Sequence, residues 1–293
     1  MKFKKKIDVL LFIEHIDREL ELAEEIKSAL NDNGFSCKIL SSIYHNLLAI
    51  LNYDAKIVIT PSTSFGKGSI SWCYENSTLN SPKFINLNYE QFISSWKGKY
   101  KSPKHEVSKN KQIHYCWGES FKQFLKSSGI PEANIKITGR PYFQLLSEKY
   151  KTKNFRSDIA SIAGIDPTKK WFFIGLTDGL AFVNEQKIKY IIEQGGDEVG
   201  LRTHIKNVKK TIEHTLSWIT NYENNTDYIF ILRPHPSISV NHYKELIFNL
   251  IGYLPRNIII TKISTAQKWI VSCDKFLTNY STLTLDASAL KIP

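Results

Sequence analysis

One segment limits the fold more than any other, and it reads Tyr228-Ile229-Phe230-Ile231-Leu232-Arg233-Pro234-His235-Pro236. Its first five residues are apolar and uncharged, which is typical of a strand buried on both faces of a parallel sheet. A proline has no N–H for a central strand, so the chain must leave the sheet at Pro234. Because ligands of open α/β sheets bind beyond the carboxyl ends of the strands, Arg233 and His235 could bind an anion such as phosphate. The alternative is a plain exit turn whose two side chains are solvated.

The rest of the chain predicts two sets of alternating strands and helices. The first set has strands at 7–13, 36–40, 55–60, 84–88, 113–117 and 135–138, with helices at 17–33 and 44–51 and a third ending at 126. The second set has strands at 171–176, 228–232, 257–261 and 275–279, with helices at 201–222, 242–251, 265–271 and 282–290. Such alternation produces parallel sheets with right-handed crossovers. Between the sets, residues 151–156 are polar and lack apolar periodicity, so we expect two domains, 1–152 and 153–293.

Composition narrows the class of protein. The 293 residues are 42% hydrophobic and 23% charged, as in soluble globular proteins, and no apolar run is long enough for a membrane-spanning helix. The four cysteines are scattered without a CxxC pair, which argues against a metal site or a disulfide framework and favours the cytoplasm. The net charge of +11 has no arginine-rich stripe, so we expect no nucleic-acid partner. A phosphorylated small molecule or an anionic membrane surface fits better, and a basic surface without a partner is the alternative.

The sequence also predicts two loops. Residues 62–69 are polar and contain glycine but lack the spacing of a P-loop, so a plain loop is the preferred interpretation. Residues 97–111 are lysine-rich, and we expect a surface loop that is either solvated or lies against a membrane.

The second half also predicts a phosphate site. Ser281 and Thr282 stand at the start of a helix that follows a strand, and a helix N-terminus binds phosphate through its unpaired N–H groups. Asp286 lies about one turn further on, where a carboxylate could accept hydrogen bonds from ribose hydroxyls. Together with Arg233 and His235 these residues predict a nucleotide pocket. The alternative for Ser281 is a simple N-cap, and the two roles are compatible.

At this point a resemblance is visible in the C-terminal half. Arg233-Pro234-His235-Pro236, followed by Thr278-Asn279-Tyr280-Ser281-Thr282, Asp286-Ala287 and Pro293, resembles bacterial surface-carbohydrate glycosyltransferases of the GT-B fold. The group includes capsule Kdo transferases, polysialyltransferases and, more distantly, CDP-glycerol polyol-phosphate transferases of teichoic acid synthesis. Full domains of this group continue beyond the proline that corresponds to Pro293, so the resemblance implies an incomplete end here.

The N-terminal half resembles the same group in three places. Trp117-Gly118-Glu119, Gly129-Ile130-Pro131 and Ile135 to Pro141 resemble the segment that ends its N-terminal domain. Phe12 to Leu20 and Asn86 to Gln91 resemble a branch known only for surface carbohydrate biosynthesis. The resemblance implies an α/β protein with two Rossmann-like parallel-sheet domains facing across a cleft: 1–152 on the acceptor side and 153–293 for the nucleotide donor.

The resemblance also implies an activity and its residues. The chain would be an inverting, metal-independent glycosyltransferase that needs no cofactor and uses a CMP-, CDP- or UDP-linked sugar donor. His235, Ser281 and Thr282 would hold the donor phosphate; the helix acid, usually Glu in this group, is Asp286 here. The acceptor would be a glycan or a lipid-linked molecule, at the inner face of the cytoplasmic membrane or free in the cytoplasm.

The catalytic base has several candidates. An inverting transfer needs a carboxylate or a histidine to take the acceptor proton. Carboxylates at predicted strand ends are Glu14, Glu90 and Glu119, with Asp178 in the second half; we rank Glu14 and Glu90 first and Asp178 lower. An ordinary capping or surface carboxylate is the alternative for each. Three other functions stay open: a CDP-dependent polyol-phosphate transferase, a UDP-sugar 2-epimerase, and a non-catalytic nucleotide-sugar-binding protein.

Overall fold

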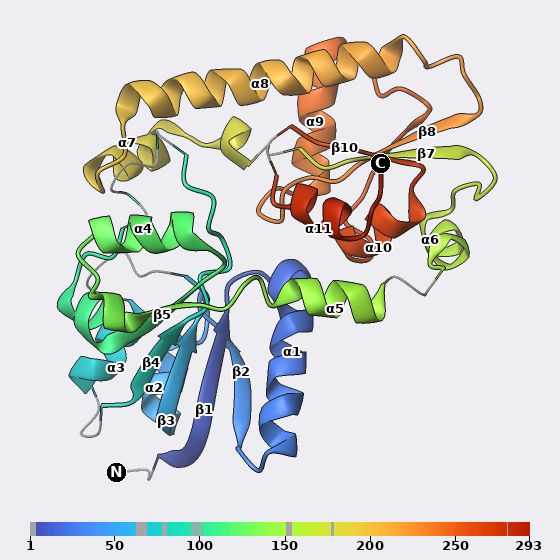
Figure 1. The fold of residues 1–293 in the computed structure, drawn as a ribbon. Helices are drawn as coiled ribbons and strands as arrows, with labels where there is room; N and C mark the ends of the chain where they lie inside the picture. The colour runs from blue at the N-terminus through green and yellow to red at the C-terminus, as the bar shows by residue number, and fades with distance from the viewer. Residues whose placement is uncertain are drawn as a thin grey trace. The chain divides into compact units, whose positions relative to one another are not determined.

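The computed structural model describes residues 4–62, 69–77, 81–94, 96, 100, 102–150, 154–176, 179–279 and 281–293 (Figure 1). Internal contacts divide the chain into two compact units. Unit 1 comprises Met1–Pro141 and Tyr190–Asp197, and unit 2 comprises Tyr142–Lys189 and Glu198–Pro293. Asp178, the loop residues 63–68 and residues 151–153 of the expected domain boundary lie outside the described residues.

Unit 1 is built on a parallel six-stranded sheet of order β2-β1-β3-β4-β5-β6. Its strands are β1 (Lys5–Ile13), β2 (Cys37–Ser41), β3 (Tyr53–Thr60), β4 (Lys83–Asn86), β5 (Gln112–Cys116) and β6 (Ile135–Ile137). Its helices are α1 (Ile16–Asp32), α2 (Asn46–Asn52), α3 (Ile70–Ser77) and α4 (Glu119–Ser127), with a π-helical turn at Val107–Lys111 and a 3₁₀ turn at Glu132–Asn134.

Both faces of this sheet are buried, as the apolar run Val9 to Ile13 of the central strand β1 predicts. Val9 and Leu11 of β1 pack with Ala23 of α1 on one face. Leu10 and Phe12 point to the other face, where they join Ala49 and Ile50 of α2 and Tyr74 of α3. Alternate residues of a strand point to opposite faces, so helices cover both sides of the sheet.

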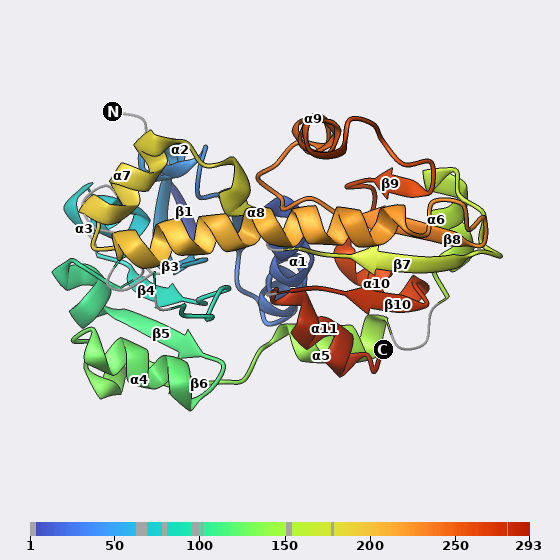
Figure 2. The same ribbon diagram turned by 90° about the horizontal axis from the view of Figure 1, so that it is seen from above.

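Unit 2 has a parallel four-stranded sheet of order β10-β7-β8-β9, and Figure 2 shows the four strands side by side in this order. Its strands are β7 (Lys170–Ile174), β8 (Tyr228–Leu232), β9 (Ile258–Ile260) and β10 (Lys275–Leu277). Its helices are α5 (Tyr142–Lys149), α6 (Arg156–Ala163), a 3₁₀ turn (Gly179–Phe182), α8 (Glu198–Thr220), α9 (Val240–Ile251), α10 (Ala266–Ser272) and α11 (Leu283–Ala289). Helix α7 (Glu185–Glu193) begins in unit 2, and its last residues belong to unit 1.

The core of unit 2 also lies on both sides of its sheet. Phe230 of β8 packs with Leu216 of α8 and Ile247 of α9. On the opposite side Phe173 of β7 stacks on Trp269 of α10, with ring centroids 6.1 Å apart.

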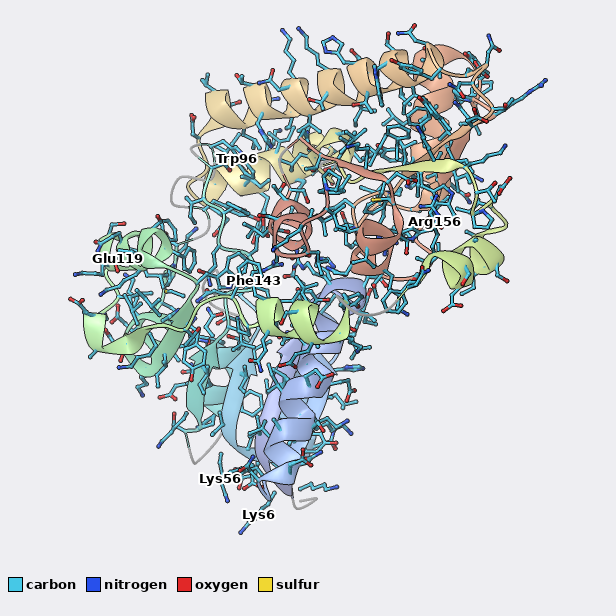
Figure 3. All side chains as sticks on the ribbon, turned by 45° about the vertical axis from the view of Figure 1, so that its right-hand side comes forward. Lys6, Lys56, Trp96, Glu119, Phe143 and Arg156 are labelled. Carbon is cyan, nitrogen blue, oxygen red and sulfur yellow. The ribbon has the colours of Figure 1, made fainter. Side chains whose placement is uncertain are left out.

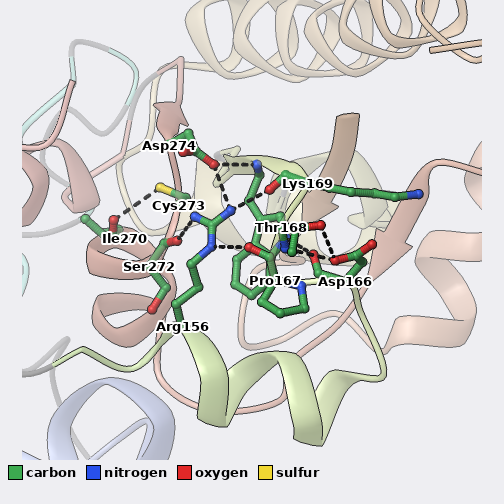
Figure 4. Close-up of polar contacts among 10 residues, drawn as sticks. Arg156, Asp166, Pro167, Thr168, Lys169, Ile270, Ser272, Cys273 and Asp274 are labelled. Atoms are coloured by element: carbon green, nitrogen blue, oxygen red, sulfur yellow. Dashed lines mark hydrogen bonds and ion pairs between the residues drawn. The ribbon is translucent and has the colours of Figure 1, made fainter. Parts of the chain in front are cut away.

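Arg156, the first residue of α6, ties the amino end of this sheet together (Figure 4). Its Nε donates to the carbonyl of Pro167 at 2.9 Å and its Nη1 to the carbonyl of Ser272 at 2.7 Å. Its Nη2 donates to the carbonyl of Lys169 and to a carboxylate oxygen of Asp274, the latter at 3.0 Å. The guanidinium also lies 4.3 Å from the centre of the Trp171 ring.

All ten predicted strands are present, and the predicted class, α/β with parallel sheets, is confirmed. The prediction of a surface loop at 97–111 is wrong at its end, because Val107 and Ser108 of the π-helical turn are buried. Helices α3, α6 and α7 were not expected. The boundary between the two units falls before α5, because α5 packs on α11 of unit 2. The sequence predicted a boundary after α5.

Candidate functional site

The strand order of unit 1 creates a position for a ligand. From β1 the chain moves outward to β2, then returns to β3 on the other side of β1 and continues to β6. The crevice beyond the carboxyl ends of β1 and β3, where the direction reverses, is the preferred ligand position in open α/β sheets. A pocket lies there. It is lined by Glu14, Arg18, Pro61, Ser62, Asn88, Tyr89, Glu90, Phe92, Ile93 and Phe121.

Both first-ranked acids belong to this pocket. Glu14 follows β1 and exposes 41% of its side chain, and Glu90 follows β4 and is also exposed. The fold therefore brings together two carboxylates that are far apart in the sequence. Glu119, the third acid of unit 1, begins α4 and does not line the pocket.

The loop between β1 and α1 rests on a buried ion pair. The side chain of Glu19 has no exposed surface, and its Oε1 accepts hydrogen bonds from Arg18 Nε at 3.1 Å and Nη2 at 2.7 Å. Its Oε2 accepts from the backbone N–H of Glu14 at 2.7 Å and, more weakly, from that of His15 at 3.4 Å. A carboxylate that reaches back to the residues before a helix resembles the capping box. Glu19 thereby fixes the backbone that carries Glu14.

Arg18 is the cation of the pocket. Burial lowers the pKa of Arg18, but the charges of Glu19, Glu90 and Glu14 more than offset this, so its pKa is raised. The guanidinium is therefore permanently charged beside two pocket carboxylates. For His15 at the N-cap of α1, burial and then the charge of Arg18 lower the pKa, although the nearby carboxylates oppose them.

The loop after β4 is held by an amide network. Asn88 has φ = 48°, a left-handed conformation that is uncommon outside glycine, and it lies within the pocket wall. Its N–H donates to the side chain of Asn86 at 3.0 Å, and its Nδ2 donates to the carbonyl of Tyr115 at 3.1 Å. Gln91 donates to the same carbonyl at 3.2 Å and accepts from the N–H of Trp117 at 2.7 Å. These bonds to β5 and its exit fix the position of Glu90.

Two tyrosines complete the surroundings of the acids. Burial, followed by the charge of Glu19, raises the pKa of Tyr89, and its buried hydroxyl has no hydrogen-bond partner within the part of the chain that is described. Burial and then Tyr190, Glu14 and Glu90 raise the pKa of Tyr100 to about 12. Arg18, Glu19 and both tyrosines were not predicted as site residues. Two signals could have found part of this group: the spacing of Glu19 from the predicted helix start, and the segments 12–20 and 86–91 that carry the resemblance, which contain Arg18, Glu19 and Tyr89.

In unit 2, His235 stands on the turn beyond β8. Its Nδ1 accepts from the N–H of Ser237 at 3.2 Å and lies 2.7 Å from the Ser237 hydroxyl. A neutral ring whose Nδ1 accepts from an amide carries its proton on Nε2. Gly179 lies against this ring, since a Cβ there would be 3.2 Å from His235 Cγ and 3.3 Å from Nδ1. The turn thus presets the tautomer that can donate from Nε2.

The other residues predicted for the donor are divided between the sheet edge and the interior. Arg233 donates to the carbonyls of Ile263 at 3.2 Å and Ser264 at 2.9 Å, so it fixes the loop before α10. Ser281 accepts from the N–H of Leu283 at 3.3 Å, and the N-cap residue of α11 is Thr282, whose side chain makes no capping hydrogen bond. Asp286 is buried, and its carboxylate accepts from Gln267 at 2.9 Å.

The sheet order brings His235 and Ser281 to one edge. Strands β8 and β10 flank β7, and the exits of parallel strands lie at the same end. Two strand spacings separate β8 from β10 by roughly 10 Å. The roles of His235 and Ser281 toward a phosphate stay predictions. The ribose role of Asp286 would require its side chain to leave Gln267 and become accessible. Among the described residues, no group of three His, Cys, Asp or Glu side chains is placed to hold a metal ion.

Solved structures of three other proteins are similar to this chain. UDP-GlcNAc 2-epimerase from Methanocaldococcus jannaschii has a TM-score of 0.56 at 13% identity, covering 99% of this chain and 82% of that one. The wall teichoic acid polymerase TagF has a TM-score of 0.56 at 14% identity, covering 99% and 70%. UDP-N-acetylglucosamine 2-epimerase from Rickettsia bellii has a TM-score of 0.56 at 12% identity, covering 98% and 78%. The chain has the GT-B fold.

This similarity is one of fold, at a level of identity where activity is not inherited. No protein-family model matches the sequence, and no curated protein matches it either. In this GT-B chain, the pocket of unit 1 and the sheet edge with His235 in unit 2 are the two candidate sites.

Proposed function

We propose that the chain is an enzyme that uses a nucleotide-activated sugar or sugar acid and transfers it, with inversion, to a hydroxyl group of a glycan or lipid-linked acceptor. The observation that carries the proposal is that Glu14 and Glu90 line one pocket at the switch point of the unit 1 sheet. The neighbouring structures support a nucleotide-linked substrate, because they are two UDP-GlcNAc 2-epimerases and the wall teichoic acid polymerase TagF.

The proposed chemistry balances without a further reagent. A carboxylate oxygen of Glu90 or Glu14 takes the proton of the acceptor hydroxyl as its oxygen bonds to the anomeric carbon. The bond from that carbon to the donor phosphate breaks, and its electron pair leaves with the nucleotide. The Nε2–H of His235 and the N–H groups at Ser281 and Thr282 would stabilise the charge that develops on the phosphate.

Arg18 adds a positive charge to the pocket that Glu14 and Glu90 line, because the charges of Glu19, Glu90 and Glu14 raise its pKa. Phe92 and Ile93 add apolar surface to the same pocket wall, on which the apolar face of a sugar ring could rest.

Two measurements test the proposal in order. A thermal-shift screen with CMP, CDP, UDP and GDP identifies the nucleotide, because a ligand that binds only the folded state raises the melting temperature. With the corresponding sugar donor, Glu90→Gln and Glu14→Gln are then compared with wild type. Loss of the base should lower kcat by roughly 10²- to 10⁴-fold while nucleotide affinity is unchanged.

Glu119→Gln is the matched control, because it removes a carboxylate of unit 1 that does not line the pocket. Full turnover in both pocket variants would exclude Glu14 and Glu90 as bases. Nucleotide binding without turnover in wild type would instead support a non-catalytic nucleotide-sugar-binding protein.

The paired carboxylates also suit a second activity, epimerisation of a nucleotide sugar. One carboxylate could remove a proton from carbon, and the other could return a proton on the opposite face. In deuterated water an epimerase would incorporate deuterium into the sugar, whereas a transferase would not. A product linked through a phosphodiester would identify the third possibility, polyol-phosphate transfer from a CDP-linked donor.

A further inference from the structure

Helix α2 has two apolar faces, and one of them is exposed. Ala49 and Ile50 are buried against the unit 1 sheet. Leu47, Leu48 and Leu51 of α2 expose 69%, 48% and 60% of their surface, and Ile43 and Tyr44, in the turn before α2, expose 55% and 82%. An apolar stripe on a helix normally faces a core. Here the three leucines face solvent together with the two turn residues, and contiguous exposed apolar groups mark interaction surfaces. We call these five residues the α2 face.

The end of the α2 face where α2 passes into β3 has a basic border. No charged residue occurs from Ser42 to Tyr53. The strand register places Lys5 opposite Tyr53 and Lys6 opposite Asp54, directly after α2. Figure 3 shows Lys6 and Lys56 at the same end of unit 1.

Two more lysines adjoin this end. The ammonium of Lys38 lies 5.2 Å from the centre of the Tyr53 ring. Lys56 exposes most of its side chain while it pairs with Asp8 at 2.7 Å. The lysines at this end (Lys5, Lys6, Lys38 and Lys56) outnumber the two acids near them, Asp8 and Asp54. The border of the α2 face therefore has a net positive charge.

We propose that the α2 face docks on the surface of an anionic phospholipid bilayer. The leucines and Ile43 would enter the boundary of the acyl chains, and the lysines would contact the anionic head groups. Tyr44 suits the same boundary, because an aromatic ring with a hydroxyl prefers the interface between membrane and water. No described helix is long and apolar enough to cross a membrane. The proposed contact is with the surface of the bilayer.

Charge favours a bilayer over a second copy of the chain. A symmetric pair would bring two lysine borders together, and each chain carries a net charge of +11. An anionic surface neutralises the same border. The inference does not depend on the proposed function, because docking needs no substrate.

Flotation of the full chain with vesicles tests the docking. We expect binding to vesicles of phosphatidylglycerol and phosphatidylcholine, weaker binding to phosphatidylcholine alone, and release at about 0.5 M salt, where surface charges are screened. Leu47→Gln with Leu51→Gln should lower the partition coefficient by about tenfold or more, since two leucines lose apolar burial. Lys5→Gln with Lys6→Gln should lower it by about fivefold for each charge removed.

Val199→Gln is the matched control, because Val199 is an equally exposed apolar residue on α8 of unit 2. Circular dichroism and melting curves check that every variant is folded. The proposal is overturned if wild type does not float with anionic vesicles, or if the leucine variant floats equally well. The proposal is also overturned if sedimentation shows a dimer of the wild-type chain that the leucine substitutions dissociate and that vesicles leave intact. A failed nucleotide screen with successful flotation would reject the proposed function alone.

Discussion

A single arginine does much to hold the amino end of the unit 2 sheet. Arg156 binds three backbone carbonyls and Asp274 and stacks on Trp171. Arg156→Ala would leave these acceptors without their donor, so we expect a loss of about 2–3 kcal/mol of unfolding free energy. Arg156→Lys should recover less than half of it, because one ammonium cannot replace a planar fork. Urea denaturation followed by circular dichroism measures both, and an unchanged midpoint in the alanine variant would contradict this account.

The buried pair of Arg18 and Glu19 makes a second prediction about individual residues. Glu19→Gln would leave Arg18 without its closest carboxylate and weaken the bond to the N–H of Glu14, which should cost about 3 kcal/mol. Replacing both partners, Arg18→Met with Glu19→Gln, should cost less than the sum of the two single changes, with a coupling of about 1–3 kcal/mol. A double-mutant cycle from denaturation curves measures the coupling. Strict additivity would show that the two side chains do not act as a pair.

Strand β5 carries a buried histidine that should make unit 1 sensitive to acid. His114 is fully buried, its Nε2 donates to the carbonyl of Ser108 at 2.7 Å, and burial lowers its pKa to about 4. In the unfolded chain its pKa is about 6.5, so acid protonates the unfolded chain first. The contribution is therefore fully present above pH 6.5 and is lost as the pH falls toward 4.

Between pH 7 and pH 5 this residue alone should lower the unfolding free energy by about 2 kcal/mol. His114→Gln keeps a donor for the Ser108 carbonyl and cannot titrate. We expect the variant to lose less stability than wild type over this interval, by that amount. Denaturation curves at both pH values measure the difference, and parallel losses in the two proteins would show that His114 does not titrate as described.

The elements differ in how far the sequence could predict them. The strands were predictable because they are rich in apolar and β-branched residues, and Pro61 and Pro234 end two of them sharply. Helix α2 was predictable as amphipathic, but periodicity identifies a stripe and not the side on which the core lies. Helix α3 is short and its flanking residues are polar, so no periodic signal marked it.

The candidate sites show the same limit. Glu14 and Glu90 could be named because both follow strands, and their shared pocket depends on a strand order that the sequence does not contain. Asp286 was expected to face a ligand, yet its side chain points to Gln267 of α10. One turn of helical spacing fixes the distance from Ser281 but does not determine what packs on that face.

At the level of the whole molecule, each unit has its own sheet and its own core, so a ligand of one unit should protect that unit most. A nucleotide at His235 should slow hydrogen exchange in peptides of β7, β8 and β10 more than in those of β1 to β5. At a concentration of 100 times Kd the added stability is about 2.7 kcal/mol. His235→Ala should weaken nucleotide affinity roughly ten- to a hundred-fold, because a hydrogen bond to a charged group contributes about 1.5–3 kcal/mol.

Gly179→Ala tests the same turn without removing the imidazole. Its new methyl group would lie 3.2 Å from the His235 ring, so the ring must move by a few tenths of an ångström. A smaller loss, about three- to tenfold, is expected, since the donor is retained but displaced. His242→Ala, an exposed histidine on α9, is the control and should bind as wild type does. Calorimetric titration with the best nucleotide compares the three variants. Equal affinity in His235→Ala and wild type would remove His235 from the phosphate site, and a collapsed melting curve in that variant would make its role structural.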